Sequence, residues 1–207
     1  MKIPAWTVLP TSLLFSFAAY GDSFKQIIHS VDASSLESVE FDISVAEIDI
    51  EIYDGDEIQL EIDIEAQRSW FSWRKRDVDN IELDVEGDGS SVYLGIDANN
   101  IQQHWRIKLP AKLALNMDLG VGDIHIKGFS NDLHLELGVG AVRVEVDDTD
   151  YGQIHVSAGV GDANIRGFTH RADNERSFVS ADAYYHGEGD LEMSIEVGVG
   201  DVEVRNR

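Results

Sequence analysis

The chain has 207 residues, enough for one domain and a leader, and 43% of them are hydrophobic. Its 39 acidic residues outnumber the 16 basic ones and give a formal net charge of −23 at pH 7, so repulsion from phosphate groups argues against a nucleic-acid partner. The chain contains no cysteine, which excludes disulfides, thiol catalysis and the disulfide-stapled class of small secreted domains.

The first residues have the composition of an export signal. The run MKIPAWTVLPTSLLFSFAAYGDS has one lysine, a short apolar stretch and small residues around Ala18. We therefore expect a secretory signal peptide at 1–20, cleaved between residues 18 and 21, and one exported domain at 21–207. An uncleaved membrane anchor is the alternative. Pro4, Pro10 and the shortness of the apolar run argue against a membrane span, and we expect none after cleavage.

The segment that follows alternates apolar and polar residues. Apolar side chains occupy odd positions over 39–45 and even positions over 48–52. Alternation with a period of two is typical of a strand with one buried face. Further alternating runs at 58–64 and within 81–96, the latter interrupted by Gly-Asp-Gly at 87–89, predict hairpins. We expect a less regular, hairpin-containing N-terminal part.

One segment differs from the acidic body. The run RSWFSWRKR at 68–76 gathers three aromatic and four basic residues. Such enrichment is typical of contact surfaces and membrane interfaces. Two interpretations remain open: the aromatic rings cap an open end of the core, or the segment contacts a partner or an anionic membrane surface. The residues of the contact hypothesis are Trp70, Phe71, Trp73, Arg74, Lys75 and Arg76.

From about residue 112 the chain repeats one turn with a period near twenty. The best copies read LNMDLGVGDIHIKG, LHLELGVGAVRVEV, IHVSAGVGDANIRG and MSIEVGVGDVEVRN, with a degenerate SADAYYHG between the last two. Apolar positions change parity after each glycine of the turn, so they stay inside only if the chain bends there. Because glycine adopts positive φ without steric cost, we expect structural corners at Gly122, Gly140, Gly161 and Gly200.

A fixed period of this length is typical of stacked structural units. Each unit would be a strand, a corner and a second strand, and neighbouring units would pair at about 4.8 Å per rung. The sequence therefore predicts an all-β protein. Its architecture would be a single-stranded, parallel β-helix-like solenoid, right-handed and stacked in chain order, with regular coils from about 112.

Stacking in chain order also predicts which side chains share a column. The corner column would hold Asp162, Asp182 and Asp201, whose carboxylates suit Ca²⁺. The alternative is that each aspartate caps its own turn by accepting a backbone N–H. His134 and His155 would share another column, which without a third ligand indicates surface polar residues rather than zinc. We assign no metal and no cofactor, and the acidity indicates either solubility or a surface for cations or a basic partner.

Motifs of catalysis are absent from the sequence. It contains no G-x-S-x-G, no H-E-x-x-H and no phosphate-binding loop. Carboxylate pairs abound, but they are expected on the solvent face of an acidic β-protein, and none is distinguished as an acid and base pair. The sequence therefore predicts a non-catalytic protein, with a hydrolase acting on envelope glycans as the distant alternative.

The run HWRIKLPAKLALNMDLGVGDIHIKGF and the further L-x-L-x-x-G-V-G-D copies resemble the toast-rack type of putative adhesin domain, over about residues 36–207. The resemblance implies an adhesin-like fold, an exported location in the periplasm or at the cell surface of a bacterium, and no catalytic residues. We expect binding or sensing of an envelope protein, a glycan or a membrane surface through an extended face. Self-association through open solenoid edges, as a structural protein, is the alternative. Ala141, which replaces the corner aspartate, and the degenerate copy depart from the pattern.

Overall fold

The computed structural model describes residues 24–66, 78–96, 98, 101–146, 151–168, 173–176 and 180–207. These residues form strands and turns, and none of them belongs to a helix that could cross a membrane. The strands are β1 (Phe24–Asp32), β2 (Ser38–Tyr53), β3 (Glu57–Ala66), β4 (Asp84–Gly87), β5 (Ser91–Ile96), β6 (Ile101–Pro110), β7 (Ala114–Phe129), β8 (Leu133–Val146), β9 (Tyr151–Val160), β10 (Ala163–Arg166), β11 (Asp173–Arg176), β12 (Ala181–His186) and β13 (Leu191–Asn206). The all-β prediction is confirmed.

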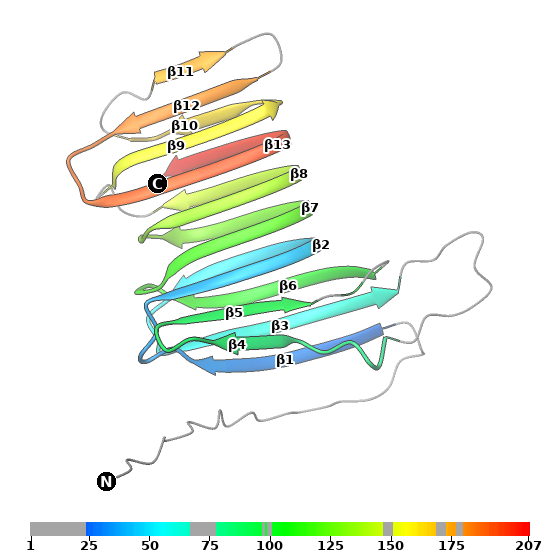
Figure 1. Ribbon diagram of the computed structural model, residues 1–207. Helices are drawn as coiled ribbons and strands as arrows, with labels where there is room; N and C mark the ends of the chain where they lie inside the picture. Colours follow the sequence, from blue (N-terminus) through cyan, green and yellow to red (C-terminus); the bar gives the residue numbers. More distant parts are fainter. Residues whose placement is uncertain are drawn as a thin grey trace, which may run out of the picture.

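The strands form one mixed sheet whose order is β1-β3-β6-β2-β7-β8-β13-β9-β12-β11 (Figure 1). Off this path, β5 pairs with β2, β4 with β5, and β10 with β13. Neighbours from β6 to β9 are parallel, and the strands beyond them pair antiparallel at both ends. The predicted hairpin around 87–89 is confirmed, because β4 and β5 are antiparallel partners.

Each long strand bends once, and the bend brings its two halves over one another. In β2 the buried positions are odd from Val39 to Ile43 and even from Ala46 to Ile50. Where two bent strands pair, the half before the bend of one pairs with the half before the bend of the other, and likewise for the halves after it. We call each bent strand a rung. The first layer comprises β4, β5, β9, β12 and residues 38–43, 114–119, 133–137 and 191–197. The second layer comprises β1, β3, β6, β10 and residues 47–53, 123–127, 141–146 and 201–206.

The apolar side chains of both layers meet in one core. Phe41 of the first layer packs edge-on against Trp105 of the second, with ring centroids 6.1 Å apart. Towards the far end, the ring centroids of Tyr185 on β12 and Phe168, which follows β10, lie 4.6 Å apart. Burial of each large apolar side chain contributes about 1.5–3 kcal/mol, so the alternating pattern itself holds the two layers together.

The rungs are not stacked in chain order, so that prediction is wrong. The last copy of the repeat, β13, lies between β8 and β9, because Ile195 pairs with Leu135 on one side and Val156 on the other. The degenerate copy forms β12, which does not bend and pairs antiparallel with β9. The right-handed winding stays a prediction.

The corner geometry explains the place of β12 at the end of the bent strands. Gly122, Gly140, Gly161 and Gly200 have φ values from 142° to 150°. A Cβ on Gly200 would lie 1.6 Å from the carbonyl oxygen of Gly140, and one on Gly161 would lie 1.8 Å from that of Gly200. A rung stacked on such a corner must therefore carry glycine there. β12 contains no glycine, so it fits only beyond the last bent rung.

Candidate functional site

The outer faces of the two layers differ in charge. Along the second layer, basic side chains alternate with carboxylates. Along the first layer, none of the outward side chains that the structure describes belongs to lysine or arginine. The basic residues on the strands of the second layer's outer face are Arg106, Lys108, Lys127, Arg143, Arg166 and Arg205.

Four carboxylates form a row across the first layer. Asp42 pairs with Asp118, Asp118 with Glu136, and Glu136 with Glu196, one on each of four neighbouring parallel rungs. Two unit charges about 4.8 Å apart repel by about 0.9 kcal/mol even in water. Desolvation raises the pKa of Asp118, and repulsion by Asp42 and Glu136 raises it further. The carboxylate row therefore concentrates negative charge on the outer face of the first layer.

A polar hollow of about 330 Å³ lies beside the carboxylate row. Its lining includes Asn116, His134, Ser194 and His155, which occupy one line across neighbouring rungs. The prediction that His134 and His155 share a column is confirmed, but Ser194 on β13 lies between them. The backbones of His134 and His155 are therefore two strand spacings apart, about 9.6 Å. This separation argues against one zinc ion shared by the two histidines.

The histidines of this face have other partners. His134 Nε2 lies 3.4 Å from Glu136 Oε1, and His155 Nε2 lies 3.6 Å from Asp182 Oδ1. The ring of His155 also stacks on Tyr184, with centroids 4.5 Å apart. These contacts link the hollow to the carboxylate row, so the two features form one polar surface.

The predicted corner column of three aspartates is also wrong. Asp201 and Asp162 are adjacent, and Asp201 Oδ1 accepts the backbone N–H of Asp162 at 3.0 Å. Asp182 instead lies on β12, where it pairs with Ser157 away from the corner. Asp123 Oδ1 accepts the N–H of Ala141 in the same way, at 3.0 Å. Asp123 and Asp201 therefore each cap the neighbouring rung rather than their own turn.

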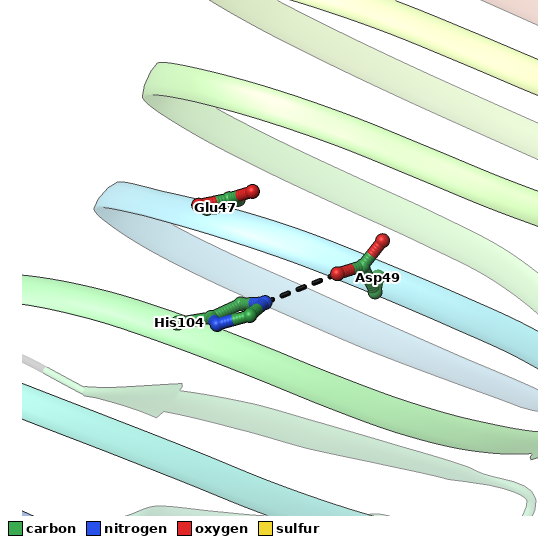
Figure 2. Close-up of side chains that lie close together, drawn as sticks. All are labelled: Glu47, Asp49 and His104. Carbon is green, nitrogen blue, oxygen red and sulfur yellow. Dashed lines mark hydrogen bonds and ion pairs between the residues drawn. The ribbon is translucent and has the colours of Figure 1, made fainter.

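A second cluster lies on the outer face of the second layer (Figure 2). Glu47 and Asp49 of β2 and His104 of β6 each offer a ligand atom within 4.8 Å of the others. His104 Nε2 is 3.0 Å from Asp49 Oδ2. On the other side of β2, His125 Nδ1 lies 3.8 Å from Asp49 Oδ1. Asp49 is therefore flanked by imidazoles from both neighbouring strands, β6 and β7.

Two hollows adjoin this cluster. One, of about 340 Å³, is lined by Glu47 and His104, and the other, of about 720 Å³, by Asp49 and His125. Arg106 lines the larger hollow, where it forms ion pairs with Glu61 at 2.8 Å and Asp63 at 2.7 Å. Sequence reasoning missed this cluster because His104 lies 55 residues from Asp49 and outside the repeats. Only the pairing of β2 with β6 brings them together.

Two predictions fall on residues outside the described ranges. The contact segment at 68–76 and the leader at 1–20 both lie there. Their roles stay predictions.

The sequence matches no family model and no curated protein. Among solved structures, a putative cell adhesion protein from Clostridium sporogenes has 18% identity and a TM-score of 0.53, with 89% of this chain and 100% of that chain covered. A putative adhesin from Bacteroides fragilis has 12% identity and a TM-score of 0.32, covering 87% and 97%. Another, from Parabacteroides merdae, has 9% identity and a TM-score of 0.28, covering 89% and 96%. The resemblance to adhesin-like domains is thus confirmed at the level of the fold, by the first of these.

Proposed function

We propose that this chain is an exported, non-catalytic, adhesin-like protein of the bacterial envelope that binds a basic partner through the outer face of its first layer. The observation that carries the proposal is the carboxylate row Asp42-Asp118-Glu136-Glu196, which no lysine or arginine on the described part of that face balances. A stable fold gains nothing from aligning like charges on neighbouring strands, whereas a cationic partner relieves their repulsion.

The shape of the face favours a macromolecular surface over a small substrate. The row crosses four rungs at a regular spacing of about 4.8 Å, and the adjoining hollow is shallow and polar rather than enclosed and apolar. Repeat proteins commonly bind through such extended surfaces. We infer that basic side chains of an envelope protein lie along the row, and that the hollow receives one neighbouring polar group.

The location and the absence of catalysis belong to the same proposal. The composition of residues 1–20 supports export. The fold shared with a protein named for cell adhesion supports a binding role. The sequence also lacks the common catalytic motifs.

Binding of decalysine, used as a model for a basic surface, tests the proposal. We expect saturable binding that weakens with added salt, because the contact is electrostatic. The double variant Asp118→Asn/Glu136→Gln should weaken binding at least five-fold. Glu51→Gln/Glu65→Gln, which removes the same charge from the second layer, is the matched control and should change binding less than two-fold. Equal loss in both variants would show attraction by net charge alone and contradict the proposal.

Self-association is a second candidate function, favoured by the edge strand β1. In the described part of the chain β1 pairs only with β3, and it exposes 39% of Phe24 and 48% of Ile28. Exposed edges with apolar side chains invite strand pairing between molecules. Sedimentation at several concentrations measures this directly. A species whose mass is that of one chain at all concentrations would contradict self-association.

A further inference from the structure

We propose that Glu47, Asp49 and His104 form a binding site for one divalent transition-metal ion of the Zn²⁺ type. This inference concerns the second layer and does not depend on the function proposed for the first. Ligand atoms of the three residues already lie within 4.8 Å of one another, and the pair His104 Nε2 and Asp49 Oδ2 is at 3.0 Å.

The separations suit a small ion. With bonds of about 2.0–2.2 Å to nitrogen and oxygen, two ligands of a tetrahedral ion lie about 3.3–3.5 Å apart. The Asp49 and His104 atoms are close to that separation, and Figure 2 shows their side chains directed towards one another. Glu47 is exposed, so its flexible side chain can move the short remaining distance.

The backbone beneath the cluster is fixed. Glu47 pairs with His104 in the parallel register of β2 and β6, and Ile48 pairs with Trp105 next to it. Ile48 and Trp105 are buried in the core, at 1% and 0% exposure. The ligand side chains therefore project from a part of the sheet whose opposite face is tightly packed, which keeps the site assembled before an ion arrives.

The donor set selects the kind of ion. One imidazole and two carboxylates suit Zn²⁺ and its neighbours, whereas Ca²⁺ and Mg²⁺ prefer sites made of oxygen alone. Two carboxylates with a neutral imidazole carry a charge that one divalent ion balances. Three protein ligands leave a fourth position for water or a bound group, and the hollows lined by Glu47, Asp49 and His104 give access to it.

His125 is a positioning residue for this site. Its Nδ1 lies 3.8 Å from Asp49 Oδ1, the carboxylate oxygen not used by His104. Its Nε2 is buried without a hydrogen-bond partner among the described residues. A hydrogen bond from His125 to Asp49 would orient the carboxylate towards the ion, as partners of metal-bound carboxylates commonly do.

Calorimetric titration of the untagged, chelator-treated chain with Zn²⁺ tests the site, and Co²⁺ absorption reports its coordination. We expect one equivalent of Zn²⁺, unaffected by millimolar Ca²⁺, and visible Co²⁺ bands that depend on His104. His104→Asn should weaken Zn²⁺ binding at least ten-fold, because loss of a residue that merely orients a metal ligand already costs about 10–100-fold. Asp49→Asn should do the same, with unchanged circular dichroism showing that both variants fold.

His134→Asn is the matched control. His134 also lies beside a carboxylate, 3.4 Å from Glu136, but it lies on the first layer and, among the residues that the structure describes, belongs to no such three-residue group. This variant should bind Zn²⁺ as the parent chain does. Absence of saturable Zn²⁺ binding by the parent would overturn the proposal, and so would parental affinity in folded His104→Asn or loss of binding in His134→Asn.

Discussion

A Cβ atom on Gly140 would lie 1.7 Å from the carbonyl oxygen of Gly122 on the neighbouring rung. Because real Cβ atoms do not come this close to backbone oxygen, the two rungs can stack at their corners only if the second carries glycine. A Cβ atom on Gly122 would likewise lie 1.7 Å from the carbonyl oxygen of Ala46 on β2. The methyl group of Ala46 itself is accommodated because β2 is the first of the bent strands. The pairing of β2 with β5 ends at Ile43 and its pairing with β6 begins at Glu47, so neither strand pairs with β2 at Ala46.

Corner substitutions should therefore be unusually costly. Gly140 combines positive φ with a blocked Cβ position, so we expect Gly140→Ala to destabilise the fold by about 3–5 kcal/mol, from backbone strain plus displacement of the neighbouring rung. Val at Gly122, Gly161 or Gly200 should exceed the roughly 1 kcal/mol of an ordinary point mutation. Urea denaturation measures these losses.

Two glycines at the β4–β5 hairpin distinguish the cost of backbone strain from the cost of the contact between rungs. Gly89 has φ +104° but open space around its Cβ position, and Gly87 has neither positive φ nor a contact closer than 3.7 Å. We expect Gly89→Ala to cost about 1–2 kcal/mol and Gly87→Ala less than about 0.5 kcal/mol. If Gly140→Ala costs no more than Gly89→Ala, the contact between rungs is not the cause.

A polar side chain at position 141 should supply the hydrogen bond to the next rung that Ala141 cannot make. Asp123 caps the N–H of Ala141 and Asp201 that of Asp162, but Ala141, which pairs with both Asp123 and Asp201, has no side chain to cap the next rung. We expect Ala141→Asn to stabilise the fold by about 0.5–1 kcal/mol. Ala141→Asp should instead destabilise the fold at low salt, because repulsion of about 0.9 kcal/mol in water from each of the two flanking aspartates exceeds the gain from the cap.

Salt provides the check on that difference. The loss of stability in Ala141→Asp should shrink as ionic strength rises and the flanking repulsion is screened, whereas the gain from Ala141→Asn should stay constant. A destabilising Ala141→Asn at every salt concentration would show that the corner does not accept a cap at this rung.

The raised pKa of Asp118 predicts a pH-dependent gain for Asp118→Asn. Desolvation and the carboxylates of Asp42 and Glu136 disfavour its ionised form in the folded chain. A carboxyl whose folded pKa lies above its unfolded value destabilises the fold at neutral pH, and this cost disappears as pH falls through the folded pKa. Asp118→Asn should therefore melt at a higher temperature than the parent at pH 7, and the difference should vanish in acid.

Asp42→Asn tests the source of that shift. Removal of its charge should lower the pKa of Asp118 towards the ordinary value, which carboxyl NMR titration detects. An Asp118 pKa that Asp42→Asn does not move would exclude repulsion along the carboxylate row.

The contact hypothesis for 68–76 can be tested by tryptophan fluorescence once the emission of Trp105 is removed by substitution. Trp105 is fully buried, and its Nε1 donates to Gln103 Oε1 at 3.0 Å, so its emission would mask other tryptophans. In a Trp6→Phe/Trp105→Phe background, emission from Trp70 and Trp73 should shift to the blue on addition of phosphatidylglycerol vesicles and return with salt. Neutral phosphatidylcholine vesicles are the control. An emission that is quencher-protected and unchanged by either vesicle would support the end cap instead.

The bent strand itself was predictable from sequence because its causes are local. Alternation fixes which side chains of 114–119 face inwards, the parity change requires a bend, and Gly122 is the residue that permits it. The adjacency of β7 and β8 follows similarly, since consecutive copies with matching glycines stack with little chain between them.

Only the tertiary structure decided the order of the remaining rungs and therefore the composition of the candidate sites. The copies share nearly the same apolar pattern, so pattern alone cannot say which copy pairs with β8. The glycine contact excludes β12 from that place, but Gly161 and Gly200 both satisfy it, so the contact does not choose between β9 and β13. The pairing of β13 with β8 places Glu196 beside Glu136, where stacking in chain order would have placed Ser157. Likewise, Asp49 meets His104 only through the pairing of β2 with β6. Alternation encodes which side of a strand a residue faces, but not which strand lies next to it, because backbone hydrogen bonding is the same for every partner.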